Sequence, residues 1–393
     1  MPDNTEQLQN HWLAVFIAVF CGIVGALQIG KLPIAAPFLQ QDLGIDRSTI
    51  GNLGAIFSII GMLAGIPIGM FVLRLGLRFS INLGLGTIAL SSLIAPLLPH
   101  LGVIYFFRIL EGLGFVLITV SAPTLIQGSV QLAYRNTAMS YWGTFMPIGI
   151  TIMMFTGPAF HNWQSIWYGN ALIAAFTLLL VRKFVPPPQA QPEALSLLQI
   201  RHLLKSIFSV NAPLRMALMF GCYALMHFAL FNFLPLLLIE QLGLNHTQAG
   251  IISGLAIGAN IAGNLCAGYL LSRNLKRAQL MRATFVVMII CGSSVFAFQL
   301  PVLVVALLCI LFSGVGGMIP TSILSSAPII APSPMAIPIT VGLLMQGSNL
   351  GQGLGPLIAG WSTQIYGWES AAFVISIFGL IGLILLLYKR LEA

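Results

Sequence analysis

The sequence predicts an all-α membrane protein built from two similar halves, and three observations support this prediction. First, 58% of the 393 residues are hydrophobic, only 7% are charged, and the mean hydropathy is +0.96. Soluble domains carry about 25% charged residues. Second, the apolar segments are continuous and do not alternate with a period of two residues, which favours helices over a β-barrel. Third, the two halves of the chain resemble each other.

Twelve apolar segments are long enough to cross a bilayer as helices, for which about 20 residues suffice. They are about residues 12–38, 49–73, 79–98, 103–127, 137–160, 165–184, 214–239, 247–271, 280–299, 301–325, 337–360 and 369–388. The chain therefore divides into an N-terminal six-helix bundle (1–185), a cytoplasmic linker (186–213) and a C-terminal six-helix bundle (214–393).

The linker contains three consecutive prolines, Pro186, Pro187 and Pro188, which cannot continue a helix. Residues 195–208 follow with apolar side chains at helical spacing. We expect this stretch to lie along the membrane surface.

The internal repeat is visible without gaps in the first two predicted helices of each half. A shift of 199 residues places Gly51 on Gly250, Gly69 on Gly268, Arg74 on Arg273 and Arg78 on Arg277. Parallel repeats of six helices joined by a cytoplasmic linker are the plan of one large class of transporters.

The basic residues predict the orientation, because cytoplasmic loops of membrane proteins are enriched in lysine and arginine. With the amino terminus in the cytoplasm, all of the 17 basic residues except Lys31, Arg47 and Arg108 fall at the cytoplasmic side. Both termini are then cytoplasmic. This distribution also explains the net charge of +8 without a nucleic-acid partner.

Several other classes of protein are excluded by what the sequence lacks. The five cysteines lie in apolar segments and form no Cys-x-x-Cys pair, and there is no Walker loop, catalytic triad or cluster of metal ligands. Residues 1–11 contain no lysine or arginine, which argues against a cleaved signal peptide. We therefore expect no enzyme activity, no cofactor and no metal. The expected partners are a small-molecule substrate and the lipid bilayer, for a monomer in the plasma membrane, most simply a bacterial inner membrane.

Three charged residues stand out because they lie inside predicted membrane helices: Lys31, Arg108 and Glu111. Arg108 and Glu111 are three residues apart and project from the same side of a helix. At 1.5 Å per residue, Lys31 and Arg108 lie roughly 9 Å outside the bilayer midplane. Charges at that depth need polar partners, so we predict that Lys31 and Glu111 pair. In the alternative, Arg108 satisfies Glu111 within one helix and Lys31 stands alone or extends to the outer surface.

Glu111 has two interpretations. It is either a permanent ion-pair partner or a group that takes up and releases a proton during a transport cycle. If all three charges face a central cavity, the formal charge of that cavity is +1, which suits a small anion or a zwitterion.

Further polar and aromatic residues in the apolar segments are candidates for contacts with a substrate. His227 aligns with Gln28 in the repeat and precedes Asn232 by five residues, and Gln346 and Asn349 share one helix face. Tyr141 and Trp142 either line a cavity or only pack, and packing is the commoner role. Glycines repeat every four residues at Gly61, Gly65 and Gly69 and again at Gly347, Gly351 and Gly355. These favour close helix contacts rather than ligand contacts.

Two motifs resemble the major facilitator superfamily, over essentially the whole chain. Gly69-Met-Phe-Val-Leu73-Arg74-Leu-Gly76-Leu-Arg78 resembles the family's Gly-x-x-x-Asp-Arg-x-Gly-Arg-Arg/Lys loop, except that Leu73 replaces the aspartate. The repeat copy has Ser272 at that position. Arg108-x-x-Glu111-Gly112-x-Gly114 resembles the fourth-helix motif often linked to proton coupling. The resemblance implies the fold of that family and a conformational role for Gly69, Arg74, Gly76 and Arg78.

Within that superfamily, residues 108–115, 122–126 and 141–149 resemble the cyanate/nitroimidazole-type permeases. The predicted function is secondary active transport of a small anionic or zwitterionic solute by alternating access, coupled to protons. One alternative is proton-driven efflux of an apolar or weakly basic compound, and another is a membrane sensor that does not transport. The predicted substrate-binding residues are Lys31, Arg108, Gln28, Tyr141, Trp142, His227, Asn232, Gln346 and Asn349, with Glu111 in proton coupling.

Overall fold

The computed structural model describes residues 11–45, 47–156, 159–185 and 197–387, and all regular structure in these ranges is helical. Ten helical segments in them are long and apolar enough to cross a membrane. Helix α16 (Ile337–Tyr366) and the shorter apolar helix α17 (Ser370–Leu386) complete the twelve predicted spans. The predicted all-α membrane fold is therefore confirmed.

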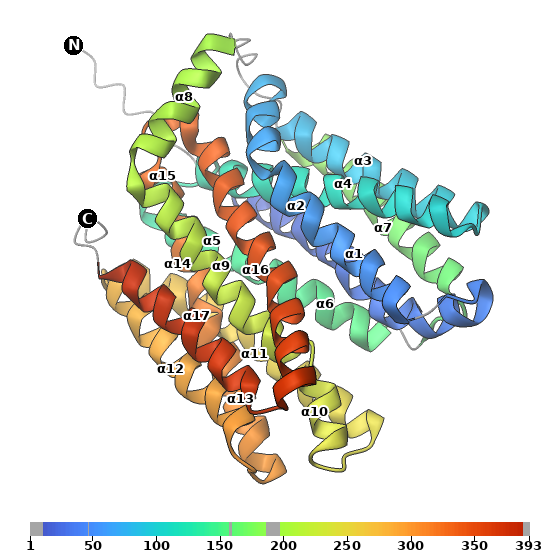
Figure 1. Cartoon of the computed structure of the whole chain (residues 1–393). Helices are drawn as coiled ribbons and strands as arrows, with labels where there is room; N and C mark the ends of the chain where they lie inside the picture. Colours follow the sequence, from blue (N-terminus) through green and yellow to red (C-terminus); the bar gives the residue numbers. More distant parts are fainter. Residues whose placement is uncertain (1–10, 46, 157–158, 186–196, 388–393) are drawn as a thin grey trace, which may run out of the picture.

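The first half contains six spans, of which the fifth is broken into two helices (Figure 1). Its helices are α1 (Trp12–Leu43), α2 (Arg47–Leu75), α3 (Leu77–Ile94), α4 (Leu101–Gly128), α5 (Arg135–Gly143), α6 (Phe145–Thr156) and α7 (Trp163–Phe184), with short 3-10 turns η1 (Ala95–Leu97) and η2 (Leu132–Tyr134).

The second half repeats this plan, with its first and fourth spans broken. Its helices are α9 (Asn211–Phe231), α10 (Leu234–Glu240), α11 (His246–Ser272), α12 (Arg277–Ala297), α13 (Val302–Gly316), α14 (Met318–Ser325), α15 (Ala327–Ile330), α16 and α17, with the turn η4 (Pro334–Ala336).

Proline explains where the broken spans are interrupted. A proline inside a helix removes one hydrogen bond and clashes with the carbonyl group four residues earlier. Helices α5, α9 and α13 end at Gly143, Phe231 and Gly316, each four residues before Pro147, Pro235 or Pro320. The breaks place irregular backbone next to the space between the two halves.

The predicted linker is partly described. Residues 186–196, with the three prolines, lie outside the described residues, as do residues 1–10 and 388–393 at the termini. The predicted surface stretch forms helix α8 (Leu197–Ser209), and α9 begins at Asn211. The predicted linker boundaries and the position of the termini relative to the membrane stay predictions.

The outside of the molecule is apolar, as expected for a surface that contacts lipid. Large hydrophobic side chains are exposed on helices of both halves, among them Leu63, Phe106, Leu172, Leu307 and Phe373. Many polar side chains inside the spans are buried, among them those of the charged cluster described below.

The two halves meet mainly through α2 with α16 and α5 with α11, and to a lesser extent through α4 with α16, α5 with α14 and α6 with α11. Glycine makes these contacts close. A Cβ added at Gly69 would approach the Pro338 carbonyl oxygen to 2.8 Å, and one added at Gly268 would overlap Ser140. Gly61 and Gly65 lie equally close to Asn349 and Gln346. The prediction that Gly61, Gly65 and Gly69 serve close helix contacts is confirmed.

These contacts extend from the middle of the spans to one end of the molecule, which we call the basic end because Arg78, Arg135, Lys276 and Arg277 lie there. Arg78 donates to the carbonyl oxygen of Arg182 there, and Thr137 meets Ser272 across the two halves at 3.2 Å. At the opposite end of α2 and α11, a Cβ added at Gly51 or Gly250 would meet nothing within 4 Å. The halves are thus in contact at the basic end and apart at the other.

Candidate functional site

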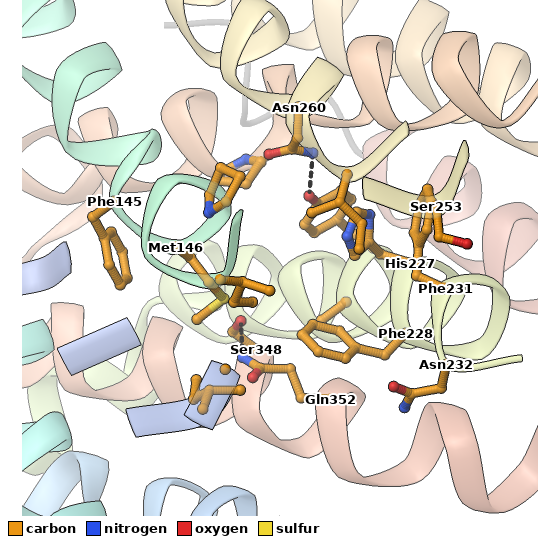
Figure 2. A pocket seen from close by; sticks show the side chains of 18 of the residues that line it. Phe145, Met146, His227, Phe228, Phe231, Asn232, Ser253, Asn260, Ser348 and Gln352 are labelled. Carbon is orange, nitrogen blue, oxygen red and sulfur yellow. Dashed lines mark hydrogen bonds between the residues drawn. The ribbon is translucent and has the colours of Figure 1, made fainter. Parts of the chain in front are cut away.

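A cavity of about 350 Å³ lies between the two halves. The first half lines it with residues of α1 and α6, and the second half lines it with residues of α9, α11, α14 and α16. Most of the lining is apolar, and Phe145, Met146, Phe228 and Phe231 surround the space in Figure 2. The lining continues to Gly250 and Gly254, toward the end where the halves are apart.

The polar groups of the cavity come mainly from the second half. Asn260 donates to the Tyr223 hydroxyl oxygen at 3.1 Å and to the Ser313 carbonyl oxygen at 3.0 Å. Gln352 donates to Ser348 at 3.1 Å (Figure 2). Because the Tyr223 oxygen accepts from Asn260, its own hydrogen is available to a bound molecule.

His227 lies one turn beyond Tyr223 on α9, with its ring centroid 4.6 Å from that of Phe231. Its Nδ1 atom is buried and has no hydrogen-bond partner among the described residues. A buried polar atom without a partner is costly. A ligand group in the cavity would relieve that cost, so His227 is the polar side chain best suited to contact a ligand.

No charged residue lines this cavity. The expectation of a cavity with a formal charge of +1 is therefore wrong for this conformation. The reason is the direction of α1: Ile29, Gly30 and Pro33 face the cavity, whereas Lys31 points into the first bundle.

Lys31, Arg108 and Glu111 form a buried cluster inside the first bundle. Lys31 Nζ lies 2.5 Å from Glu111 Oε1, and Arg108 Nη1 lies 2.8 Å from Glu111 Oε2. The prediction that Lys31 and Glu111 pair is confirmed, and Arg108 shares the same carboxylate. The alternative in which Lys31 stands alone is excluded.

Residues of α1, α3, α4 and α7 hold Lys31 in this cluster. Lys31 Nζ also donates to Gln28 Oε1 at 2.7 Å and to Ser92 at 3.2 Å, and it lies 4.3 Å from the Trp167 ring centroid. Gln28 in turn donates to Asn170 on α7 at 3.0 Å. These partners compensate part of the cost of burying charge.

Arg108 is held in the same way. Its Nη1 donates to the Gln28 carbonyl oxygen at 2.9 Å, and its Nε donates to the Leu53 carbonyl oxygen at 3.5 Å. Its guanidinium lies 4.8 Å from the Phe57 ring centroid. The cluster as a whole carries two positive charges and one negative charge in a fully buried position.

Of the other predicted substrate-binding residues, only His227 and Asn232 line the cavity. Trp142 is buried and stacks on Phe145, with 4.3 Å between the ring centroids. Tyr141 packs against Trp12 and Phe16.

Gln346 and Asn349 belong to the contact between α16 and α2 rather than to the cavity. Gln346 donates to the Met62 carbonyl oxygen at 2.7 Å, and Asn349 donates to the Met345 carbonyl oxygen at 2.8 Å. In this conformation neither side chain lines the cavity.

The loop after α2 lies at the basic end. Gly76 has a φ of 83°, a left-handed conformation that favours glycine, and Arg74 is an exposed side chain in the last turn of α2. Gly69 packs on α16, and Arg78 bonds to the end of α7. The conformational role of this loop stays a prediction.

Four further polar residues line the cavity and were not predicted from the sequence: Tyr223, Asn260, Ser348 and Gln352. Helical spacing carried a signal for two of them, since Tyr223 is four residues before His227 and Gln352 is three residues after Asn349. Asn260 offered no such signal, because only the tertiary structure brings its side chain to the Tyr223 hydroxyl group on α9 and the Ser313 carbonyl oxygen on α13.

Comparison with known proteins gives three kinds of similarity. The family model of the Major Facilitator Superfamily matches residues 14–336. A 3-(3-hydroxy-phenyl)propionate transporter of Escherichia coli (strain K12) is 28% identical over 284 residues, which are 66% of this chain and 65% of the relative. Multidrug resistance protein 2 of Bacillus subtilis (strain 168) is 30% identical over 180 residues, 44% of this chain and 45% of the relative. The matched parts thus span less than two thirds of each relative's length.

Among solved structures, the human organic anion transporter MFSD10 (TETRAN) has a TM-score of 0.81 at 16% identity, with 96% of this chain and 100% of the other covered. This likeness concerns the fold. None of the three proteins is described as a cyanate or nitroimidazole permease, so the finer resemblance gains no support from them.

Proposed function

The chain belongs to the Major Facilitator Superfamily, and from this premise we propose that it is a secondary transporter that carries a small organic molecule by alternating access. The observation that carries the proposal is the central cavity, which both halves line and which the glycine contacts close at the basic end only. Rocking of the halves about this cavity would open the basic end and close the other.

The proposed substrate has an apolar, preferably aromatic, body and one weakly acidic group. Phe145, Phe228 and Phe231 supply apolar surface for a ring, and His227 and the Tyr223 hydroxyl supply hydrogen bonds for a polar group. The similarity to a transporter named for 3-(3-hydroxy-phenyl)propionate supports this class. An anionic solute thus remains the leading proposal, but with His227 in the role that was expected of Lys31 and Arg108.

A second candidate is efflux of an apolar or weakly basic compound. Two observations favour it: no charged residue lines the cavity, and the chain is similar to a multidrug resistance protein. A compound without a strong charge would lose little hydration energy on entering such a site.

We also propose that Glu111 couples transport to protons. The geometry requires that Lys31 change its position or its charge when Glu111 is protonated. Protonation of Glu111 alone would leave Lys31 and Arg108 buried without a counter-charge. Such a state is costly, so proton uptake requires Lys31 to leave Glu111 or to lose its own charge. Movement of α1, which carries Lys31 and also lines the cavity, would link this change to substrate binding.

We further propose that the basic end faces the cytoplasm of a bacterial inner membrane and that the protein works as a monomer. The charge distribution supports the orientation. Lipid and substrate are the proposed partners, and the basic residues need no nucleic acid to explain them.

A thermal-shift screen of the purified protein tests the proposed substrate. We expect 4-hydroxybenzoate or 3-phenylpropionate to raise the unfolding temperature, because a ligand that binds only the native state stabilises it. Galactose serves as the polar comparison and tetraphenylphosphonium as the hydrophobic cation. Stabilisation by the cation alone would favour the efflux candidate.

The site is tested by His227→Gln, with His202→Gln on α8 as the matched control. We expect the His227 variant to bind the aromatic acid at least about tenfold more weakly, because each good hydrogen bond to a charged group contributes about 1.5–3 kcal/mol. Equal affinity in both variants would remove His227 from the site.

A further inference from the structure

A second hollow, of about 360 Å³, lies at the basic end where the two halves meet. The first half contributes Arg135 and Asn136 at the start of α5. The second half contributes the connection between α11 and α12, with Lys276 and Arg277, and residues of α14 and α15. The hollow therefore joins two parts of the molecule that are expected to separate when the basic end opens.

Three cationic side chains, Arg135, Lys276 and Arg277, line the hollow, and no acidic side chain does. Both ion pairs within the described residues use Glu111, far from this place in the fold. Leu73 and Ser272 occupy the aspartate position of the family's loop motif in the two halves, and neither supplies a carboxylate. The three charges thus lack an anionic partner in the described part of the chain.

The donors of the hollow are oriented by the surrounding structure. Arg135 Nε donates to the Gln127 carbonyl oxygen at 3.1 Å, and Arg277 Nη2 donates to Ser325 at 3.1 Å. The Nε atom of Arg277 is buried without a hydrogen-bond acceptor among the described residues. An anion in the hollow would supply that acceptor.

The amino end of α12 adds to the attraction for an anion. Helix α12 begins at Arg277, and Lys276 occupies the N-cap position without a side-chain hydrogen bond to the helix. The first N–H groups of a helix are directed outward and carry a partial positive charge. Phosphate groups are common ligands of such helix ends.

The rim of the hollow is apolar and exposed. Leu132, Leu275 and Ile329 are all exposed and all line it. Basic residues beside exposed apolar side chains match the chemistry of a phospholipid, whose phosphate is anionic and whose chains are apolar.

We propose that a phosphate group binds in this hollow and bridges Arg135 of the first half to Lys276 and Arg277 of the second. The bridge stabilises the conformation that is closed at the basic end, in which Thr137 and Ser272 lie 3.2 Å apart. A ligand that binds one conformation better than the other shifts the equilibrium toward it. The phosphate comes from a phospholipid headgroup or from a soluble phosphate compound.

Binding is tested by thermal unfolding of the purified full-length protein during titration with dioleoylphosphatidylglycerol or dioleoylphosphatidylcholine. We expect the phosphatidylglycerol to raise the unfolding temperature more. Lys276→Gln should raise the half-maximal lipid concentration about fivefold, in line with the contribution of one basic residue near an anionic lipid. Lys276→Arg should behave like the unmodified protein.

The matched control is Lys205→Gln, which removes the same charge from the exposed face of α8. A separate titration with inorganic phosphate, at ionic strength held constant with NaCl, distinguishes the sources. A Lys276-dependent effect of inorganic phosphate supports a soluble compound, and an effect of phosphatidylglycerol alone supports a lipid headgroup. The absence of both effects, or equal responses of Lys276→Gln and Lys205→Gln, overturns the site.

The conformational step has its own readout, which does not need a transport substrate. In a Cys266→Ala background and with an added oxidant, Thr137→Cys and Ser272→Cys should form a disulfide faster with phosphatidylglycerol, or with inorganic phosphate added to phosphatidylcholine, than with phosphatidylcholine alone. Lys276→Gln should abolish the difference. Equal rates under all three conditions overturn the proposed stabilisation of the closed conformation, whether or not the transport proposal holds.

Discussion

The Lys31 ammonium group on α1 and the Glu111 carboxylate on α4 form a fully buried ion pair, with 2.5 Å between Nζ and Oε1. Arg108 holds the other oxygen of the same carboxylate. One negative charge thus serves two positive charges, so the cost of removing each partner is expected to differ.

Removal of Glu111 is expected to be the most damaging change in the cluster. Glu111→Gln leaves two buried cations without a counter-charge and should lower the free energy of unfolding by about 3–5 kcal/mol. Lys31→Met leaves the Arg108–Glu111 pair and should cost less. Unfolding in denaturant, with the exposed Glu240→Gln as control, measures both changes.

The coupling between the two residues is measured by adding the double variant. If Lys31 and Glu111 interact as the geometry indicates, the double variant should be more stable than the sum of the single effects implies. Effects that add within about 0.5 kcal/mol would contradict the pair.

Arg108→Lys should affect stability and leave ligand binding in the cavity unchanged. Lysine keeps the charge but loses the planar group whose Nη1 reaches Glu111 and the Gln28 carbonyl oxygen while its Nε reaches the Leu53 carbonyl oxygen. We expect a loss of about 2–3 kcal/mol, measured by denaturant unfolding. A weaker affinity for the cavity ligand with unchanged stability would instead indicate direct contact with the substrate.

The sequence predicted that Lys31 and Glu111 pair, but not that the pair lies inside the first bundle rather than in the cavity. The reason is the orientation of α1. Gln28 and Lys31 share one face of the helix, and Gly30 and Pro33 share another. One face is buried in the first bundle and the other lines the cavity, so no polar-apolar pattern distinguishes them. Only the packing of α1 against α3, α4 and α7 resolves this.

The repeat predicted the architecture more reliably than the site. Gly69 and Gly268 align in the sequence and both make close contacts at the basic end. His227 and Gln28 also align, yet His227 lines the cavity and Gln28 bonds within the first bundle. Backbone contacts follow the repeat because both halves share one fold, whereas the side-chain environments of α1 and α9 have diverged.

Cysteine labelling tests the orientation proposed from the basic residues. In a Cys266→Ala background, His161→Cys should react with a membrane-impermeant maleimide in intact cells, because His161 is exposed at the end opposite the basic end. Lys183→Cys at the basic end should react only after permeabilisation. The reverse pattern would overturn the orientation.

We propose that the two halves open alternately at the two ends of the cavity. Distances between spin labels on the two halves measure this motion directly. One pair, at Leu75 and Gln279, reports the basic end, and another, at Gln41 and Thr247, reports the opposite end; all four residues are exposed. Gly65→Leu should force α2 from α16, because even a Cβ would overlap the Gly342 carbonyl group and Gln346, whereas Gly51→Leu meets open space and serves as control. We expect Gly65→Leu to lengthen the first distance and shorten the second, and Gly51→Leu to change neither. A Gly65→Leu protein in which only one distance changes, or in which both change in the same direction, would contradict alternating access.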